Sequence, residues 1–388
     1  MYESLRFVMF SPVDNFHIMS TFVDSSCTLK DIELRIASLI SQQFQTHVNI
    51  NNHLSSTCAH TLQQVIRQAI VSSEGGKRLR ALLTLAAFQS LADGNTIQKN
   101  QEQAIFDIAC ALEIFQTAAL IHDDIIDESA LRRGKPSAHY ALSSACSNRH
   151  IGTGLGLMLG DLLATESFDI TRGAAKHFAY DEELLAAFAS MQRNVGIGQV
   201  LDLSIEMMQL DDPVKIAESS LNVFRWKTAS YTTIAPLTLG LLAASMEPHE
   251  AYQLAHNIGD PLGIAFQLAD DLLDIVSDSK HTGKPIGGDI REGKRAVLLA
   301  DALQHSNKHE QDILLEAYTS DSRSEDDVQR IIQIYHTSGA IERSQQRIMN
   351  LWKQSQNAID ASSLNSNGKT ILHTISQRFI PEAWRNVQ

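Results

Sequence analysis

Residues 105–126, IFDIACALEIFQTAALIHDDII, decide the fold class of the chain. Their apolar residues recur at intervals of three and four, the spacing that aligns side chains along one side of an α-helix. The same spacing returns in residues 29–40, 62–70, 79–91, 184–205, 214–242, 251–276 and 328–352. The alternation of apolar and polar residues that is typical of strands is almost absent. The sequence therefore predicts an all-α protein.

The composition excludes several other classes of protein. With 44% hydrophobic residues, 20 Gly and 4 Cys in 388 residues, the chain is too apolar for disorder, too poor in glycine for a collagen-like repeat and too poor in cysteine for a disulfide scaffold. Proline interrupts helices, so the presence of only 8 Pro favours long helices in a single large bundle. The cysteines form no CxxC pair, so we expect neither a zinc site nor a disulfide framework, and a reducing cytoplasm is the expected compartment.

The charge of the chain also limits its partners. The chain has 32 Lys and Arg against 45 Asp and Glu, a net charge of −13, which disfavours nucleic acid as the main partner. Residues 1–30 lack both sustained periodicity and the features of a signal peptide, so we expect a weakly ordered extension before one domain over residues 31–388. Residues 228–246 carry no charge, but their Ser and Thr residues and Pro236 favour a buried helix over an integral membrane segment.

One acidic pattern occurs twice and is the most informative feature of the sequence. The first triplet, Asp123, Asp124 and Asp127, ends the apolar stretch 105–126, and the second triplet repeats its spacing within FQLADDLLD (266–274). The second triplet consists of Asp270, Asp271 and Asp274. A single acidic cluster on a helix is usually a solvated face. Two such clusters on apolar helices favour a shared site for a hard divalent cation, Mg²⁺ in particular, which prefers carboxylate oxygens.

Basic residues beside these triplets and beside glycines predict binding of a polyphosphate. Magnesium held by carboxylates usually keeps coordination positions for water and phosphate oxygens. Each cation alone would most simply be a surface charge, but their placement together favours a diphosphate site. These cations are Lys77, Arg78, Arg80, Arg132, Arg133, Lys227, Lys284 and Lys294. The residues thus predict an all-helical, Mg²⁺-dependent enzyme that acts on diphosphates.

At this point the sequence resembles a known family, the trans-isoprenyl diphosphate synthases or polyprenyl synthetases. The likeness covers about residues 35–380 and rests on the order of GGKRLR (75–80), DDIID (123–127) with LRRG (131–134), GQVLDL (198–203), Lys227-Thr228, FQLADDLLD and GKPIGGD (283–289). The resemblance implies a helical bundle around a deep central cavity, in which the two triplets face each other and hold Mg²⁺ ions. It assigns the metal ligands to Asp123, Asp127 and Asp270, with Asp271, Asp274 and Asp202 as further acidic positions. It also implies a homodimer.

The resemblance further implies how two substrates bind and react. Arg132, Lys227 and Lys284 would stabilise the diphosphate that leaves an allylic substrate, and Lys294 would belong to a closing lid. Isopentenyl diphosphate would bind at Lys77, Arg80, Arg133 and Gln116. Thr228 and Gln267 would lie near the allylic carbocation. The residues expected to be catalytic are Asp123, Asp124, Asp127, Lys227, Thr228, Gln267 and Asp270.

Small side chains before the first triplet lead us to expect a long product. Ala119 lies one helical turn before Asp123, with Ala118 beside it. Relatives that make farnesyl diphosphate typically have a bulky aromatic residue at one of these positions. We therefore expect geranylgeranyl diphosphate or a longer product, with Phe115 either a lower floor of the cavity or a core residue.

Three other readings stay open on the sequence alone. A class I terpene cyclase or a head-to-head condensing enzyme also ionises allylic diphosphates, but it does not require a second diphosphate site such as GGKRLR. A phosphohydrolase built on His122 and Asp123 lacks convincing partners for its ligand set. A non-catalytic regulatory subunit of a heteromeric synthase is the third reading, although such subunits commonly lose one of the triplets.

Overall fold

The computed structural model describes residues 25–48, 54–91, 98–276, 286–320 and 322–385. Almost all of these residues that have regular structure are helical. The elements are α1 (Ser25–Val48), α2 (Ser56–Ser72), α3 (Leu79–Gln89), α4 (Lys99–Ile126), β1 (Leu131–Arg132), β2 (Lys135–Pro136), α5 (Ala138–Cys146), α6 (Arg149–Ala175), α7 (Asp181–Ile205), α8 (Pro213–Val223), the π-helix η1 (Phe224–Ile234), α9 (Ala235–Ala243), α10 (Pro248–Val276), α12 (Gly288–Glu292), α13 (Val297–His305), α14 (Lys308–Thr319), α15 (Glu325–Thr337), α16 (Ala340–Ala361), α17 (Ser366–Ser376) and α18 (Glu382–Arg385). The all-α prediction is confirmed.

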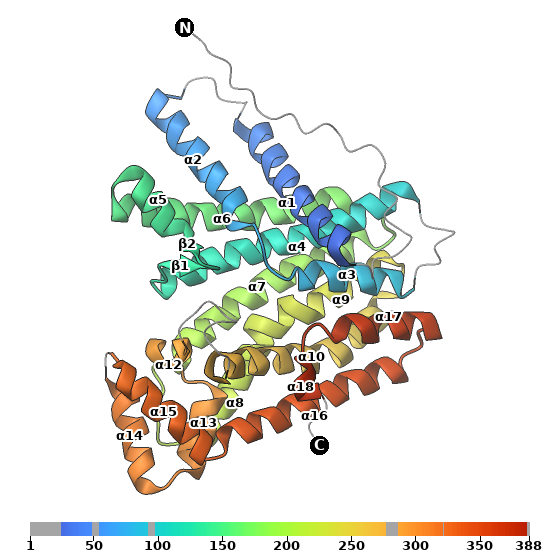
Figure 1. The fold of residues 1–388 in the computed structure, drawn as a ribbon. Helices are drawn as coiled ribbons and strands as arrows, with labels where there is room; N and C mark the ends of the chain where they lie inside the picture. Colours follow the sequence, from blue (N-terminus) through green and yellow to red (C-terminus); the bar gives the residue numbers. More distant parts are fainter. Residues whose placement is uncertain (1–24, 49–53, 92–97, 277–285, 321, 386–388) are drawn as a thin grey trace.

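The helices pack as one bundle (Figure 1). The long helices α4, α6, α7 and α10 form its middle, α1 and α2 lie along one side, and the shorter helices α12 to α15 gather at one end. One continuous cluster of buried apolar side chains runs through these elements, from Ile32 in α1 to Trp384 in α18. Burial of a Leu or Ile side chain stabilises a fold by about 1.5–3 kcal/mol, so this cluster is the main source of stability.

Helix α4 is long and apolar enough to cross a membrane, but 78% of its most apolar 18-residue window is buried inside the bundle. Its apolar residues therefore pack against neighbouring helices. The charge-free stretch 228–246 forms most of η1 and all of α9, and every residue of α9 is buried. The prediction that this stretch is a core segment is confirmed.

Several boundaries differ from those that the sequence predicted. Helix α1 begins at Ser25, so part of the expected extension is helical, and residues 1–24 lie outside the described residues. The stretch 328–352 is two helices, because Gly339 takes a φ of 73° and ends the first of them. Residues 131–136, outside every helix that the sequence predicted, form a short antiparallel hairpin that pairs Leu131 with Pro136.

Candidate active site

The first triplet lies where α4 ends. Asp127 is the residue that caps this helix, and the hairpin β1–β2 then turns back over it. The turn contains Arg133 with a φ of 53° and Gly134 with a φ of 74°, and it returns Arg132 to the end of α4. There the Nε atom of Arg132 donates to Oδ1 of the buried Asp124 at 2.8 Å, and its Nη2 atom bonds to the same oxygen. The middle aspartate of the triplet therefore holds an arginine of the hairpin.

The π-helix η1 places Lys227 against the first triplet. Its Nζ atom donates to Oδ2 of Asp202 in α7 at 2.6 Å and to Oδ1 of Asp123 at 3.1 Å. Two glycines allow α7 and α10 to come this close to η1. A Cβ at Gly198 would lie 2.3 Å from the backbone nitrogen of Lys227, and a Cβ at Gly263 would lie 2.5 Å from Cα of Ala229.

The charges around the first triplet are unevenly balanced. Burial opposes ionisation of Asp123, but Lys227, Lys294 and Arg132 outweigh it and hold the pKa of this carboxyl below its usual value. Burial and the neighbouring Asp123 raise the pKa of Asp127 to about 6. Burial also raises the pKa of Asp124, against the opposing effect of Arg132. Burial therefore disfavours the ionised form of Asp124 and Asp127, whereas the neighbouring cations favour it in Asp123.

The second triplet, near the end of α10, has different surroundings. Asp270 is exposed, whereas Asp271 is buried and accepts a hydrogen bond from Nε2 of Gln267 at 2.7 Å. Oε1 of Gln267 in turn accepts from the Thr228 hydroxyl at 2.8 Å. Burial and the nearby Asp289 hold the pKa of Asp271 well above its usual value. Asp274 accepts from the backbone nitrogen of Asp289 at 3.1 Å, which attaches α12 to α10.

Lys294 brings the two triplets into one site. Its Nζ atom lies 2.8 Å from Oε2 of Glu292, 3.4 Å from Oδ1 of Asp289 and 3.9 Å from Oδ2 of Asp127. It also acts electrostatically on the buried Asp271 of the second triplet. Lys294 therefore connects Asp127 of the first triplet to Asp289, which in turn is hydrogen-bonded to Asp274 of the second triplet. Lys284, which was assigned to the same site, lies outside the described residues.

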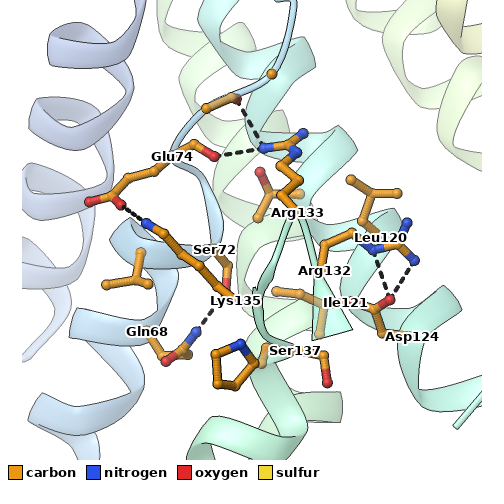
Figure 2. A pocket seen from close by; sticks show the side chains of 16 residues that line it. Gln68, Ser72, Glu74, Leu120, Ile121, Asp124, Arg132, Arg133, Lys135 and Ser137 are labelled. Atoms are coloured by element: carbon orange, nitrogen blue, oxygen red, sulfur yellow. Dashed lines mark hydrogen bonds and ion pairs between the residues drawn. The ribbon is translucent and has the colours of Figure 1, made fainter. Parts of the chain in front are cut away.

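The two glycines of GGKRLR, Gly75 and Gly76, line a cavity of about 400 Å³ together with Asp124 (Figure 2). Arg133 lines this cavity, and its Nη1 atom donates to the backbone oxygens of Glu74 at 2.7 Å and Gly75 at 2.9 Å. Lys135 pairs with the carboxylate of Glu74 at 2.7 Å. These three contacts join the hairpin to the loop at Glu74 and Gly75.

The cations of this loop point in different directions. Lys77 is exposed. Arg80 is buried, lies 4.0 Å over the ring of Tyr231 and donates to the Thr232 hydroxyl at 2.7 Å. Burial lowers the pKa of Arg133 most, and the neighbouring charge of Arg78 lowers it further. Arg132 and Arg80 add smaller effects in the same direction. Several guanidinium groups thus lie close together, an arrangement that favours binding of an anion.

The remaining predicted positions are on α4. Gln116 precedes Asp123 by seven residues and Ala119 precedes it by four, so both share its side of the helix. Both are half-buried, whereas Ala118 is fully buried. Phe115 packs edge-on against Phe188 of α7 and against Tyr231, with ring centroids 6.5 Å and 6.3 Å apart.

Comparison with known proteins agrees with this geometry. The family model described as polyprenyl synthetase matches residues 60–335. The chain belongs to the polyprenyl synthetase family. It is 31% identical to the geranylgeranyl diphosphate synthase of Sulfolobus acidocaldarius over 66% of this chain and 72% of the relative. It is also 31% identical to the octaprenyl diphosphate synthase of Escherichia coli over 71% of this chain and 77% of the relative.

A solved member of the family has the same fold. The crystal structure of the geranylgeranyl pyrophosphate synthase of Corynebacterium glutamicum, complexed with isoprenyl diphosphate and magnesium, superposes with a TM-score of 0.77 at 28% identity. The superposition covers 92% of this chain and 99% of that one. The bundle seen here is therefore the all-α isoprenoid synthase fold.

The acidic residues of this polyprenyl synthetase fit a hard divalent cation by their chemistry. In the described part of the chain, no three Asp, Glu, His or Cys side chains converge closely enough to form a metal site by themselves, because Lys227 and Lys294 lie between them. The donors are carboxylate oxygens, which Mg²⁺ prefers. Burial and neighbouring carboxylates raise the pKa of Asp127 and of Asp271.

Sequence reasoning missed two acidic residues of the site. Asp289 contacts Lys294 and is the last residue of GKPIGGD, a motif that was recognised without a role for its aspartate. Glu113 is a buried carboxylate in the middle of α4. An acidic residue inside the apolar run ACALEIFQ was the signal that could have identified it.

Proposed function

We propose that this chain is a prenyltransferase that condenses isopentenyl diphosphate head-to-tail with an allylic diphosphate and releases a trans-polyprenyl diphosphate. The observation that carries the proposal is the presence of two separate groups of charged residues near the end of α4. On one side, Lys294 pairs with Asp127 of the first triplet and with Asp289, whose backbone nitrogen donates to Asp274 of the second triplet. On the other side, the cationic segment 75–80 contacts Arg133. Such an arrangement provides for two diphosphates, and the two curated relatives named above are a geranylgeranyl and an octaprenyl diphosphate synthase.

The metal that we propose is Mg²⁺, held by Asp123 and Asp127 of the first triplet and by Asp270 of the second. Asp202, Asp271 and Asp274 support these ligands. A related polyprenyl synthase from Caulobacter crescentus was solved with calcium and isoprenyl diphosphate, and the Corynebacterium structure contains magnesium, so solved relatives hold divalent cations. Bound Mg²⁺ supplies positive charge where negative charge develops on the departing diphosphate.

The protein cations orient the allylic diphosphate and stabilise its charge as the C–O bond breaks. Lys227 and Arg132 already lie beside the first triplet, and Lys294 lies between the triplets, so their ammonium and guanidinium groups can bind diphosphate oxygens. Lys284 is proposed for the same diphosphate. The hydrogen bond from Thr228 to Gln267 orients two dipoles beside Asp271, where they stabilise the allylic carbocation.

Isopentenyl diphosphate is proposed to bind at Lys77, Arg80, Arg133 and Gln116. Its double bond attacks the allylic carbocation, a new C–C bond forms, and the proton lost from the adjacent carbon passes to the released diphosphate. Exclusion of water is essential, because water would quench the cation.

The product is proposed to be geranylgeranyl diphosphate or longer. Ala119 is on the Asp123 side of α4, and the aromatic cluster of Phe115, Phe188 and Tyr231 lies one turn further from the triplet. We expect Ala119→Phe to shorten the product by at least one isoprene unit, since a ring replaces a methyl group. Mass analysis of the products measures this. Ala118→Phe, on a buried position, is the comparison variant, and an unchanged distribution in both variants would refute the role of this wall.

The other readings receive less support. His122 lies 3.3 Å from Asp161 of α6, whereas Asp123 pairs with Lys227, so the two residues have different partners, which disfavours the phosphohydrolase. Terpene cyclases and head-to-head enzymes do not require the loop 75–80. Both triplets are intact, which disfavours a regulatory subunit.

A homodimer in the cytoplasm is also proposed. Exposed apolar residues recur at helical spacing on two neighbouring helices: Ile151, Met158 and Leu162 on α6, and Ile197, Val200 and Leu203 on α7, with Met207 just after its end. Such a stripe favours a protein partner, here a second copy of the chain. Sedimentation equilibrium should give twice the chain mass, and Val200→Glu should lower it, whereas Val214→Glu on α8 should not.

One experiment tests the proposed reaction. The purified chain is incubated with labelled isopentenyl diphosphate, each allylic primer and Mg²⁺, and the products are analysed by mass. Incorporation of label into a chain of 20 or more carbons is expected. Cyclisation of farnesyl diphosphate without incorporation would establish the cyclase reading, and inactivity of the pure chain would favour the regulatory subunit.

A further inference from the structure

The loop between α2 and α3 is held by an arginine that points into the protein. The sequence groups Arg78 with the substrate cations, but its side chain is only 2% exposed. Its Nη2 atom donates to the backbone oxygen of Ser73 at 2.5 Å. The same guanidinium lies 3.5 Å from Glu33 of α1 and 3.5 Å from Glu113 of α4. Arg78 therefore joins three segments of the bundle.

Glu113 caps helix α3 from a different helix. Arg78 is the N-cap residue of α3 and makes no side-chain capping bond. The first backbone N–H groups of a helix have no partner within it, and an acceptor on the N-cap side chain usually binds one of them. Here Oε1 of Glu113 accepts from the backbone nitrogen of Ala81, the third residue of α3, at 3.1 Å. The negative charge of Glu113 also suits the positive end of the helix dipole.

The other end of the loop is held in the same way. Oε1 of Glu33 accepts from the backbone nitrogen of Gly75 at 3.0 Å. Arg78 has a φ of 52°, a left-handed conformation that a non-glycine residue adopts only when its surroundings favour it. The backbone oxygens of Glu74 and Gly75 bind Arg133, so a displacement of the loop would displace this arginine too.

We propose that Glu113, acting through Arg78 and the first turn of α3, is a positioning residue for the isopentenyl diphosphate site. It holds in place the loop that carries Lys77 and leads to Arg80, and whose backbone oxygens bind Arg133, and it does not itself contact substrate. This inference rests on the proposed function. It explains why a carboxylate that is 1% exposed occurs in the apolar middle of α4, where an uncompensated charge would be strongly destabilising.

The test is the variant Glu113→Gln. The amide oxygen can still accept from Ala81, but the charge that faces Arg78 is lost. We expect KM for isopentenyl diphosphate to rise about tenfold, since a charge-assisted contact is lost, while KM for the allylic substrate and kcat at saturation stay within about twofold. An unchanged KM for isopentenyl diphosphate, or an equal rise for both substrates, would overturn the proposal.

A matched control separates positioning from stability. Asp301 is also a buried carboxylate, and it pairs with Arg347 at 2.5 Å and 2.8 Å between α13 and α16. Asp301→Asn should lower Tm and leave KM for isopentenyl diphosphate unchanged. The double variant Arg78→Met/Glu113→Gln removes both charges, so Tm should recover relative to Glu113→Gln while KM stays raised. Recovery of KM together with Tm would mean that Glu113 acts only on stability.

A measurement without substrate distinguishes failure of this inference from failure of the proposed function. In Glu113→Ala, hydrogen exchange at the amides of Gly75 and Ala81 should become at least about tenfold faster than in the unaltered protein. Unaltered exchange would overturn the positioning role even in an active enzyme. If the unaltered protein fails to incorporate isopentenyl diphosphate, the reaction is wrong, and the exchange result still decides whether Glu113 holds the loop.

Discussion

In the first triplet every carboxylate faces a cation from another element, whereas the buried carboxylate of the second triplet faces a neutral amide. Asp123, Asp124 and Asp127 lie near Lys227, Arg132 and Lys294 respectively. Asp271 accepts from Gln267 instead. The two triplets have identical spacing in the sequence, so spacing alone does not determine the charge state of a carboxylate. Residues distant in sequence determine it.

The largest effect is expected when an outer aspartate of either triplet is replaced. Asp123→Asn and Asp270→Asn should each lower kcat by about 10³-fold, because several kcal/mol of charge stabilisation at the proposed metal site is lost. Asp123→Asn should also destabilise the protein more than Asp270→Asn does, since Asp123 pairs with Lys227 and Asp270 is exposed. Steady-state kinetics and thermal unfolding measure the two effects. Full activity in either variant would remove that aspartate from the proposed ligand set.

The middle aspartates should differ in the sign of their effect on stability. Asp124→Asn leaves the part-buried Arg132 without its main partner and should destabilise the protein by about 2–3 kcal/mol. Asp271→Asn should leave the free energy of unfolding unchanged or raise it, because the raised pKa of Asp271 already favours its neutral form. Urea unfolding of the metal-free variants at pH 7 is the measurement. Equal destabilisation by both changes would show that the two environments are equivalent.

Asp127 should make stability depend on pH. Its folded pKa of about 6 lies above the ordinary value of 3.8, so ionisation disfavours the folded state increasingly as pH rises from about 4 to about 6. Asp127→Asn should therefore stabilise the metal-free protein by about 2–3 kcal/mol at pH 7.5 and have little effect at pH 4. Unfolding at the two pH values tests this. Asp312→Asn, on an exposed surface position, is the control and should show no such dependence.

Metal removal should have the smallest effect on stability. Lys227 and Lys294 already provide positive charge among the carboxylates, so chelation should shift Tm by only a few degrees. Turnover should stop under the same conditions. Calorimetry and an activity assay with and without chelator measure both quantities. Unfolding of the chain by a chelator would mean that the protein cations do not compensate the triplets.

The helices were predictable where large apolar side chains at helical spacing make the packing contacts, as in α4 and α10. It was not predictable in α6, which packs through glycines rather than large apolar side chains. A Cβ at Gly156 would lie 2.8 Å from Cβ of His139, and one at Gly160 would lie 2.2 Å from the ring of His122. Apolar periodicity also does not distinguish a π-helix from an α-helix, so η1 was hidden within the predicted helix 214–242.

The site residues that lie in short sequence motifs were predictable. The two triplets and Lys227 were singled out from the sequence, and the structure places Asp123 beside Lys227 and Asp127 beside Lys294. The inward direction of Arg78 was not predictable, because it depends on Glu33 and Glu113, which are distant in the sequence.

The close approach of Gly198 to the backbone of Lys227 affects how mutations in the gene should be judged. A single nucleotide change that converts this glycine to a larger residue would force α7 away from η1, since even a methyl group would lie 2.3 Å from the Lys227 nitrogen. Every aspartate, lysine and arginine of the gene product would still be present. A screen that judges alleles by their charged motifs would pass such a mutant as functional, although the spacing between Asp202 and its lysine would be lost.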